Sequence, residues 1–172
     1  MIGRRFARLA ATLSLAGLLA FGCSRAVEDA SPWVAEAERR HALADQRLEA
    51  NDRSGAQDAL RGIVSAPAPA DLPADARRGV LQDTYFRLAR IELAANDPFA
   101  ALLDADRGLA LGRPSDLFVA NLLVVRGATH EALNNAPLAA VDYHQALLIN
   151  DELLAKTLRV PADASPMPGE RP

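Results

Sequence analysis

Histidine and cysteine are the residues of this chain best suited to metal binding or nucleophilic catalysis, and both are scarce. The three histidines are His41, His130 and His144, and no two have the i, i+4 spacing that lets one helix face hold a metal ion. No serine lies in a nucleophile-elbow sequence, and no glycine-rich loop follows a strand-like segment. We therefore predict neither an enzyme nor a metal or cofactor site, and we interpret the histidines as polar residues on helix surfaces.

The only cysteine, Cys23, follows a segment that is typical of protein export. Three arginines precede the apolar run 9–21, which is too short to span a bilayer and fits a signal peptide over residues 1–22. The sequence AFGC at 20–23 resembles the lipobox of bacterial lipoproteins, which implies that the cysteine is acylated and anchors the chain to a membrane. Ser24 resembles the type sorted to the outer membrane, facing the periplasm. The alanine and phenylalanine that open this motif depart from it, so cleavage to a soluble periplasmic protein stays open.

The charge balance argues against a nucleic-acid partner. Without the three arginines of the signal, 16 basic residues stand against 22 acidic ones, and the exported chain carries a net charge of −6. Proteins that bind nucleic acids need local or overall positive charge to neutralise phosphates. A nucleic-acid partner is therefore not expected.

The rest of the sequence predicts an all-helical domain over residues 31–160. Alanine and leucine dominate, and no run shows the strict alternation or the β-branched content that a sheet needs. A serine or aspartate beside a proline marks several helix starts. The predicted helices are 32–50, 54–65, 74–95, 98–111, 116–133 and 137–149, with a short capping helix at 151–160. We expect a short tether at 23–30 and a proline-rich, disordered tail at 161–172.

One pattern of small residues on either side of a polar turn occurs three times. A small residue in one helix precedes an alanine in the next by twelve positions: Ala44 with Ala56, Ala89 with Ala101, and Gly127 with Ala139. Between them lie Asn51 with Asp52, Asn96 with Asp97, and Asn134 with Asn135. Such polar pairs accept a left-handed backbone and cap the next helix, while small residues let two helices approach closely. The pattern predicts three helical hairpins, at 32–65, 74–111 and 116–150.

This arrangement resembles the tetratricopeptide repeat over roughly residues 37–151, counted from the matching small residues. The resemblance implies a right-handed superhelical array of three degenerate hairpins. The crossing residues are 45 and 38 positions apart here, whereas the family's period is about 34. In addition, Arg47, Glu92 and His130 replace the tyrosine that is usual in the first helix. A plain helical bundle is the alternative.

The resemblance also implies a groove, lined by the first helix of each hairpin, that binds a protein or peptide segment. Counted from the crossing residues, the groove consists of Glu38, His41, Asp45, Leu48, Asp83, Phe86, Arg90, Leu93, Asn121, Val124 and Glu131. The acidic members outnumber Arg90, which would favour a basic segment. We predict a membrane-anchored periplasmic scaffold or adaptor. The alternative is a soluble exported enzyme or ligand carrier, which would instead have a closed cavity with converging titratable groups.

Apolar residues at helical spacing predict one continuous core without a disulfide or a metal. Its expected members are Leu43, Leu60, Ile63, Leu88, Ile91, Leu102, Leu109, Leu122, Leu123, Leu133, Val141 and Leu147. We expect the capping helix at 151–160 to cover Leu148 and Ile149, because repeat hairpins bury their apolar faces against neighbours.

Overall fold

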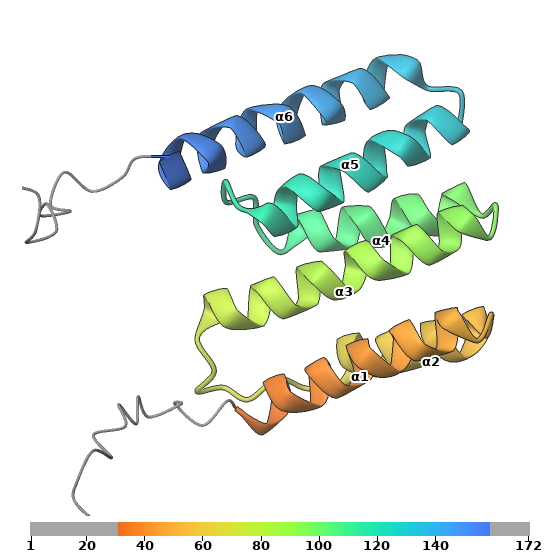
Figure 1. Ribbon diagram of the computed structural model, residues 1–172, viewed down its shortest axis with the longest axis vertical. Helices are drawn as coiled ribbons and strands as arrows, with labels where there is room; N and C mark the ends of the chain where they lie inside the picture. Colours follow the sequence, from red (N-terminus) through yellow and green to blue (C-terminus); the bar gives the residue numbers. More distant parts are fainter. Residues whose placement is uncertain (1–30, 159–172) are drawn as a thin grey trace, which may run out of the picture.

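The computed structural model describes residues 31–158, and the signal, Cys23, the tether and the tail predicted above lie outside this range. These residues form six helices: α1 (Pro32–Glu49), α2 (Arg53–Ser65), α3 (Ala74–Ala94), α4 (Pro98–Ala110), α5 (Leu117–Ala132) and α6 (Ala136–Leu158) (Figure 1). None of the six combines the length and apolar character needed to cross a bilayer. The described part of the chain is all-α, as predicted.

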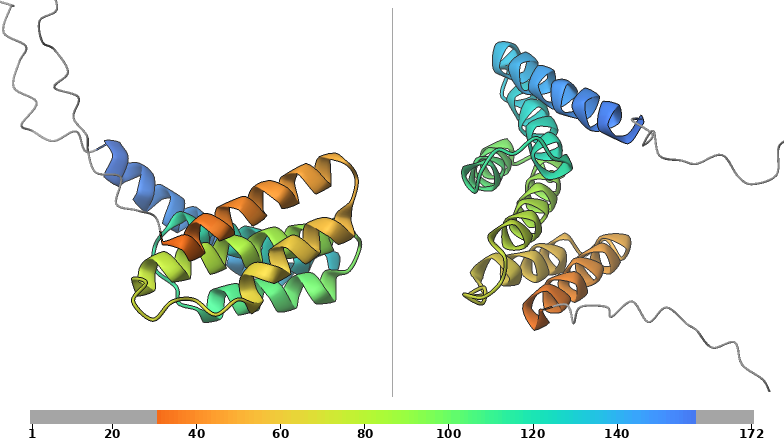
Figure 2. Two further views of the ribbon diagram at one scale, coloured as in Figure 1. Left: turned by 90° about the horizontal axis from the view of Figure 1, so that it is seen from below. Right: turned by 90° about the vertical axis from the view of Figure 1, so that its left-hand side faces the viewer.

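The helices pack as consecutive pairs, α1 with α2, α3 with α4, and α5 with α6 (Figure 1). The first helices of neighbouring pairs also touch, since α1 contacts α3 and α3 contacts α5. Among the six described helices, α2 does not contact α4, and α4 does not contact α6. Because the first helices meet while the second helices diverge, the three pairs follow an arc (Figure 2). We call the exposed surface of α1, α3 and α5 the first-helix face.

Each pair turns at an asparagine with a left-handed backbone. Asn51, Asn96 and Asn134 have φ angles of 59°, 62° and 58°. Asparagine tolerates this region better than most residues, because its short side chain forms local hydrogen bonds. The following residue caps the next helix: Asp52 accepts from Gly55 N at 2.9 Å, Asp97 from Ala100 N at 3.0 Å, and Asn135 from Leu138 N at 3.5 Å. The predicted turns are therefore confirmed.

The small residues at the predicted crossings are all buried: Ala44, Ala56, Ala89, Ala101, Gly127 and Ala139. In the third hairpin, a Cβ atom added to Gly127 would lie 2.7 Å from Cε1 of Tyr143. Carbon atoms in contact do not approach so closely, so a larger residue at 127 would displace the Tyr143 ring or move α5 and α6 apart.

The core agrees in part with the sequence prediction. Seven of the predicted residues are buried: Leu60, Ile63, Leu88, Ile91, Leu109, Leu122 and Leu123. Leu102 and Leu133 are only half-buried. The prediction is wrong for Leu43, Val141 and Leu147, which are 41%, 52% and 56% exposed. On these helices alanines such as Ala44 and Ala146 face the partner instead, and the larger residues lie on the outer side.

The predicted capping helix at 151–160 is wrong as a separate element, because α6 continues unbroken through this region to Leu158. Asn150 and Asp151 look like the polar pairs at the turns, but they do not end the helix. The ion pair of Lys156 with Glu152, at 2.7 Å and i, i+4 spacing, supports the helical conformation beyond them. The far end of α6 covers little, and Leu148, which the cap was expected to bury, is 55% exposed.

Candidate binding face

The first-helix face carries two adjoining hollows. The first, of about 210 Å³, lies where α1 and α3 meet two residues of α2, and it is lined by Ala44, Asp45, Leu48, Arg53, Leu60, Arg87, Arg90, Ile91 and Ala94. The second, of about 470 Å³, lies between α3 and α5 and is lined by Phe86, Arg90, Leu93, Ala94, Val124, Val125 and Ala128. Arg90 and Ala94 line both hollows, so the two adjoin at α3, and we refer to them together as the depression.

The spacing of residues along α3 explains how one helix serves both hollows. Phe86, Arg90 and Leu93 follow one another at intervals of four and three residues, which places them on one side of a helix. The Arg90 guanidinium lies 5.4 Å from the centre of the Phe86 ring, within the range of a cation–π contact. The depression therefore has an apolar wall on α3 and α5 with an arginine at its centre.

Arg87 pairs with Asp45, which lines the first hollow, and with Asp83 on its own helix. Its Nε donates to Asp83 at 2.9 Å within α3, and its Nη1 donates to Asp45 of α1 at 2.9 Å. Burial by itself lowers the pKa of Arg87, but hydrogen bonds and the charges of both carboxylates outweigh it and raise the pKa. The three side chains thus form a bridge between α1 and α3 in which Arg87 stays charged.

His41 also joins α1 to α3. The Thr84 hydroxyl donates to the Val80 carbonyl at 2.7 Å, so it accepts from His41 Nε2, which lies 2.9 Å away. Burial lowers the pKa of His41 even though the Asp83 carboxylate lies 3.5 Å from its Nδ1. The His41 imidazole is therefore neutral and mostly buried, and its hydrogen bond to Thr84 holds α1 against α3. His41 thus offers little to a bound segment.

The structure brings together some of the predicted groove residues and separates others. The members that line the hollows are Asp45, Leu48, Phe86, Arg90, Leu93 and Val124. His41 and Asp83 belong to the α1–α3 bridge. Glu38 is exposed on α1 and Asn121 half-buried on α5, both away from these linings. Glu131 accepts a hydrogen bond from the Tyr143 hydroxyl at 2.8 Å, inside the third hairpin.

Two arginines of the first hollow, Arg53 and Arg87, are not among the groove residues predicted from the sequence. The predicted groove contains only residues at fixed offsets from the crossing residues of the first helices. Arg53 lies at the start of α2, and Arg87 falls between the offsets. Arg87 follows Asp83 by four residues, a spacing at which opposite charges pair on a helix. That signal could have identified the bridge, whereas nothing local in the sequence relates Arg53 to α3.

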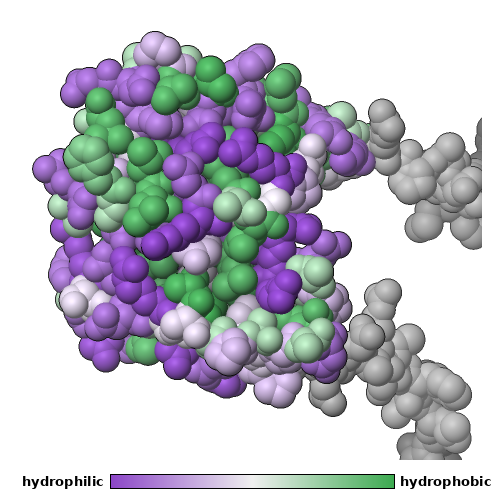
Figure 3. Space-filling view, turned by 180° about the vertical axis from the view of Figure 1, so that it is seen from behind, coloured by the Kyte–Doolittle hydropathy of each residue, from purple (hydrophilic) through white to green (hydrophobic). Residues whose placement is uncertain are grey.

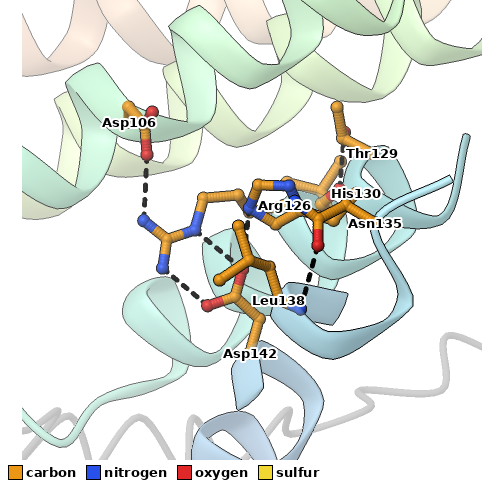
Figure 4. A network of polar contacts seen from close by, with 8 residues as sticks. Asp106, Arg126, Thr129, His130, Asn135, Leu138 and Asp142 are labelled. Carbon is orange, nitrogen blue, oxygen red and sulfur yellow. Dashed lines mark hydrogen bonds and ion pairs between the residues drawn. The ribbon is translucent and has the colours of Figure 1, made fainter. Parts of the chain in front are cut away.

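Elsewhere, an arginine network joins α5 to the buried Asp142 of α6 and to the exposed Asp106 of the neighbouring hairpin. Arg126 on α5 donates to both carboxylate oxygens of Asp142 on α6, at 2.6 and 2.8 Å, and to Asp106 on α4 at 2.9 Å (Figure 4). Chiefly through its hydrogen bond to Asp142, Arg126 has a raised pKa. His130 adds a contact of 3.8 Å to Asp142. Such paired charges are satisfied within the network, so they position helices and are not displayed to a ligand.

A second network contains two buried carboxylates. Glu92 on α3 and Asp104 on α4 are each three residues past a crossing alanine, the same positions as His130 and Asp142 in the third hairpin. Arg61 from the first hairpin donates to Glu92 at 2.6 Å and lies 3.8 Å from Asp104, which also accepts from Arg107 at 2.9 Å. Burial, followed by the charge of Asp104, raises the pKa of Glu92 to about 7.

Residues 31–158 contain no group of three or more histidine, cysteine, aspartate or glutamate side chains placed to hold a metal ion. On the side of the molecule away from the first-helix face, several groups of hydrophobic residues lie among hydrophilic ones (Figure 3). No model of a known protein family matches this chain, and neither a curated protein nor a solved structure matches it. The geometry of the first-helix face is thus the basis for a functional hypothesis.

Proposed function

We propose that this protein is a membrane-anchored periplasmic adaptor that binds a segment of another protein on its first-helix face. The observation that carries the proposal is the pair of hollows that adjoin at α3, one toward α1 and the other toward α5. Binding energy at protein interfaces concentrates in a few anchors, with aromatic and arginine residues enriched among them. Phe86 and Arg90 stand together at the centre of this depression, with the exposed Val124 opposite them.

We further propose that the three hairpins are degenerate tetratricopeptide-type repeats in a right-handed superhelix. The equivalent left-handed asparagines and the buried small residues at each crossing support equivalence of the three hairpins. The contacts between successive first helices, with the second helices apart, support curvature toward the first-helix face. A solenoid of this type has its largest concave surface on that side, which is the natural place for an extended ligand.

The anchor is part of the proposal because it limits where the partner can be. With acylation at Cys23, the seven residues 24–30 extend no further than about 25 Å before α1 begins. The first-helix face would then stay near the membrane surface, on the periplasmic side of the outer membrane. Its partner would be another periplasmic or membrane-attached protein.

Site-specific photocrosslinking in intact cells tests the proposal without knowledge of the partner. A photoreactive side chain replaces Phe86 or Val124 on the first-helix face, and Leu103 on α4 serves as the control because it is also apolar and exposed. We expect Phe86 and Val124 to capture the same protein and Leu103 to capture none. Capture of a specific protein from Leu103 alone would place the binding surface on the second helices and refute the proposal.

A further inference from the structure

The charges around the depression differ from the charges of the groove predicted from the sequence. The sequence groups four acidic residues with one arginine, but Arg87 pairs with two of those acids, and Glu131 lies in the third hairpin. The linings themselves contain one acidic residue, Asp45, and three arginines. A chain that is acidic overall therefore has a surplus of positive charge at this place.

Two of the arginines have unused hydrogen-bonding capacity. Arg53 and Arg90 are exposed, and neither forms an ion pair with any residue of 31–158. A guanidinium has five N–H donors in its plane and can bind a carboxylate through two parallel hydrogen bonds. Contact of Arg90 with the Phe86 ring holds the guanidinium in place without using those in-plane donors.

The neighbouring hollow fits an apolar side chain. Phe86, Leu93, Val124, Val125 and Ala128 line it, and Arg90 is the only charged residue among its lining residues. Val124 is 43% exposed, so a ligand that covers it removes apolar surface from water. Because Arg90 borders both hollows, a carboxylate bound to it and an apolar group in the second hollow would belong to one short stretch of chain.

We propose that the first-helix face binds an acidic segment, one that presents a carboxylate to Arg90 and Arg53 next to a large apolar side chain seated against Phe86, Leu93 and Val124. This inference rests on the proposed function and names the chemistry of its partner. It reverses the expectation of a basic segment, because the aspartates behind that expectation are already paired with Arg87.

Selection from a library of random twelve-residue peptides tests the chemistry directly. The full chain is the target, alongside an Arg90→Glu variant and an Arg77→Glu control, since Arg77 is an exposed arginine on the same helix but outside both hollows. We expect the wild-type chain to enrich peptides in which Asp or Glu adjoins Leu, Phe or Trp. One such peptide should bind Arg90→Glu at least tenfold more weakly, and Arg77→Glu as the wild type does. Circular dichroism confirms that both variants are folded.

The outcomes separate this inference from the proposed function. Enrichment of basic or uncharged peptides that still compete with crosslinking at Phe86 would overturn the acidic preference and leave the adaptor function intact. Acidic peptides that bind Arg90→Glu and wild-type chain equally would show that the carboxylate is recognised elsewhere, which also overturns the inference. A library with no enriched sequence on the wild-type chain would count against a peptide-binding face altogether.

Discussion

The buried carboxylate of Glu92 should make the stability of this protein fall as the pH rises. Its side chain is only 3% exposed, and its pKa is raised from 4.5 to about 7 by burial and by the nearby Asp104. Among the described residues its Oε2 atom has no hydrogen-bond partner, and a proton there would let it donate to Asp104. The folded chain thus keeps this proton to a higher pH than the unfolded chain does.

The size of the effect follows from the pKa difference. Stability gained from the protonated form is fully present below pH 4.5 and is lost as the pH rises through 7. At 1.36 kcal/mol per unit, the free energy of unfolding falls by at most about 3 kcal/mol across this window. A Glu92→Gln variant keeps a hydrogen-bond donor toward Asp104 but cannot ionise. We therefore expect it to be more stable than the wild type at pH 8, by about 1 to 3 kcal/mol, and similar at pH 4.5.

Urea unfolding of both chains at several pH values between 4.5 and 8 measures this difference. Other titrating groups, His41 among them, are common to both chains, so the comparison isolates Glu92. Glu49→Gln, which removes an exposed carboxylate from α1, should leave the pH dependence unchanged. If Glu92→Gln were less stable than the wild type at pH 8, the 2.6 Å ion pair with Arg61 would outweigh the cost of burial, and the reasoning would be refuted.

Four further outcomes are expected. Gly127→Leu should lower stability by about 1 to 3 kcal/mol in urea unfolding, because its side chain meets the Tyr143 ring, and a neutral result would contradict the close crossing. Asn96→Ala should cost about 1 kcal/mol and Asn96→Gly almost nothing, whereas equal losses would argue against the left-handed turn. Cys23→Ala should move the protein from the membrane fraction to the soluble one, and an unchanged distribution would exclude the lipid anchor. Deleting residues 151–158 should change the melting temperature by only a few degrees, since nearly all of their side chains are exposed; a large drop would mean that they cover the last hairpin after all.

The features that the sequence predicted well are those that depend on residues close together in the chain. The polar pair at Asn96 and Asp97 turns and caps by local hydrogen bonds, so its sequence alone identifies it. The crossing positions follow from a constant offset of twelve residues across each turn. The end of α6 is predicted too early, at residue 149, because Asn150 is not among the described residues with a left-handed backbone and the helix continues to Leu158.

The features that the sequence did not reveal depend on side chains from different hairpins. The positions within one helix could still be predicted: six predicted groove residues line the hollows, because helical periodicity orients them correctly once the crossing residue is known. The charge of the face could not be predicted by counting, since it depends on Arg87 reaching Asp45 on another helix. The pairing of Arg61 with Glu92 likewise spans 31 residues and two hairpins, a relation that no short motif encodes.

Amide hydrogen exchange of the full chain, with and without the protein captured at Phe86, tests the binding surface most directly. We predict that the partner slows exchange along the lining of the depression, at residues 44–48, 53, 86–94 and 124–128. Exchange in α4 and in the rest of α2 should stay unchanged. Slower exchange confined to α2 and α4, with the first helices unaffected, would contradict the assignment of the first-helix face as the binding surface.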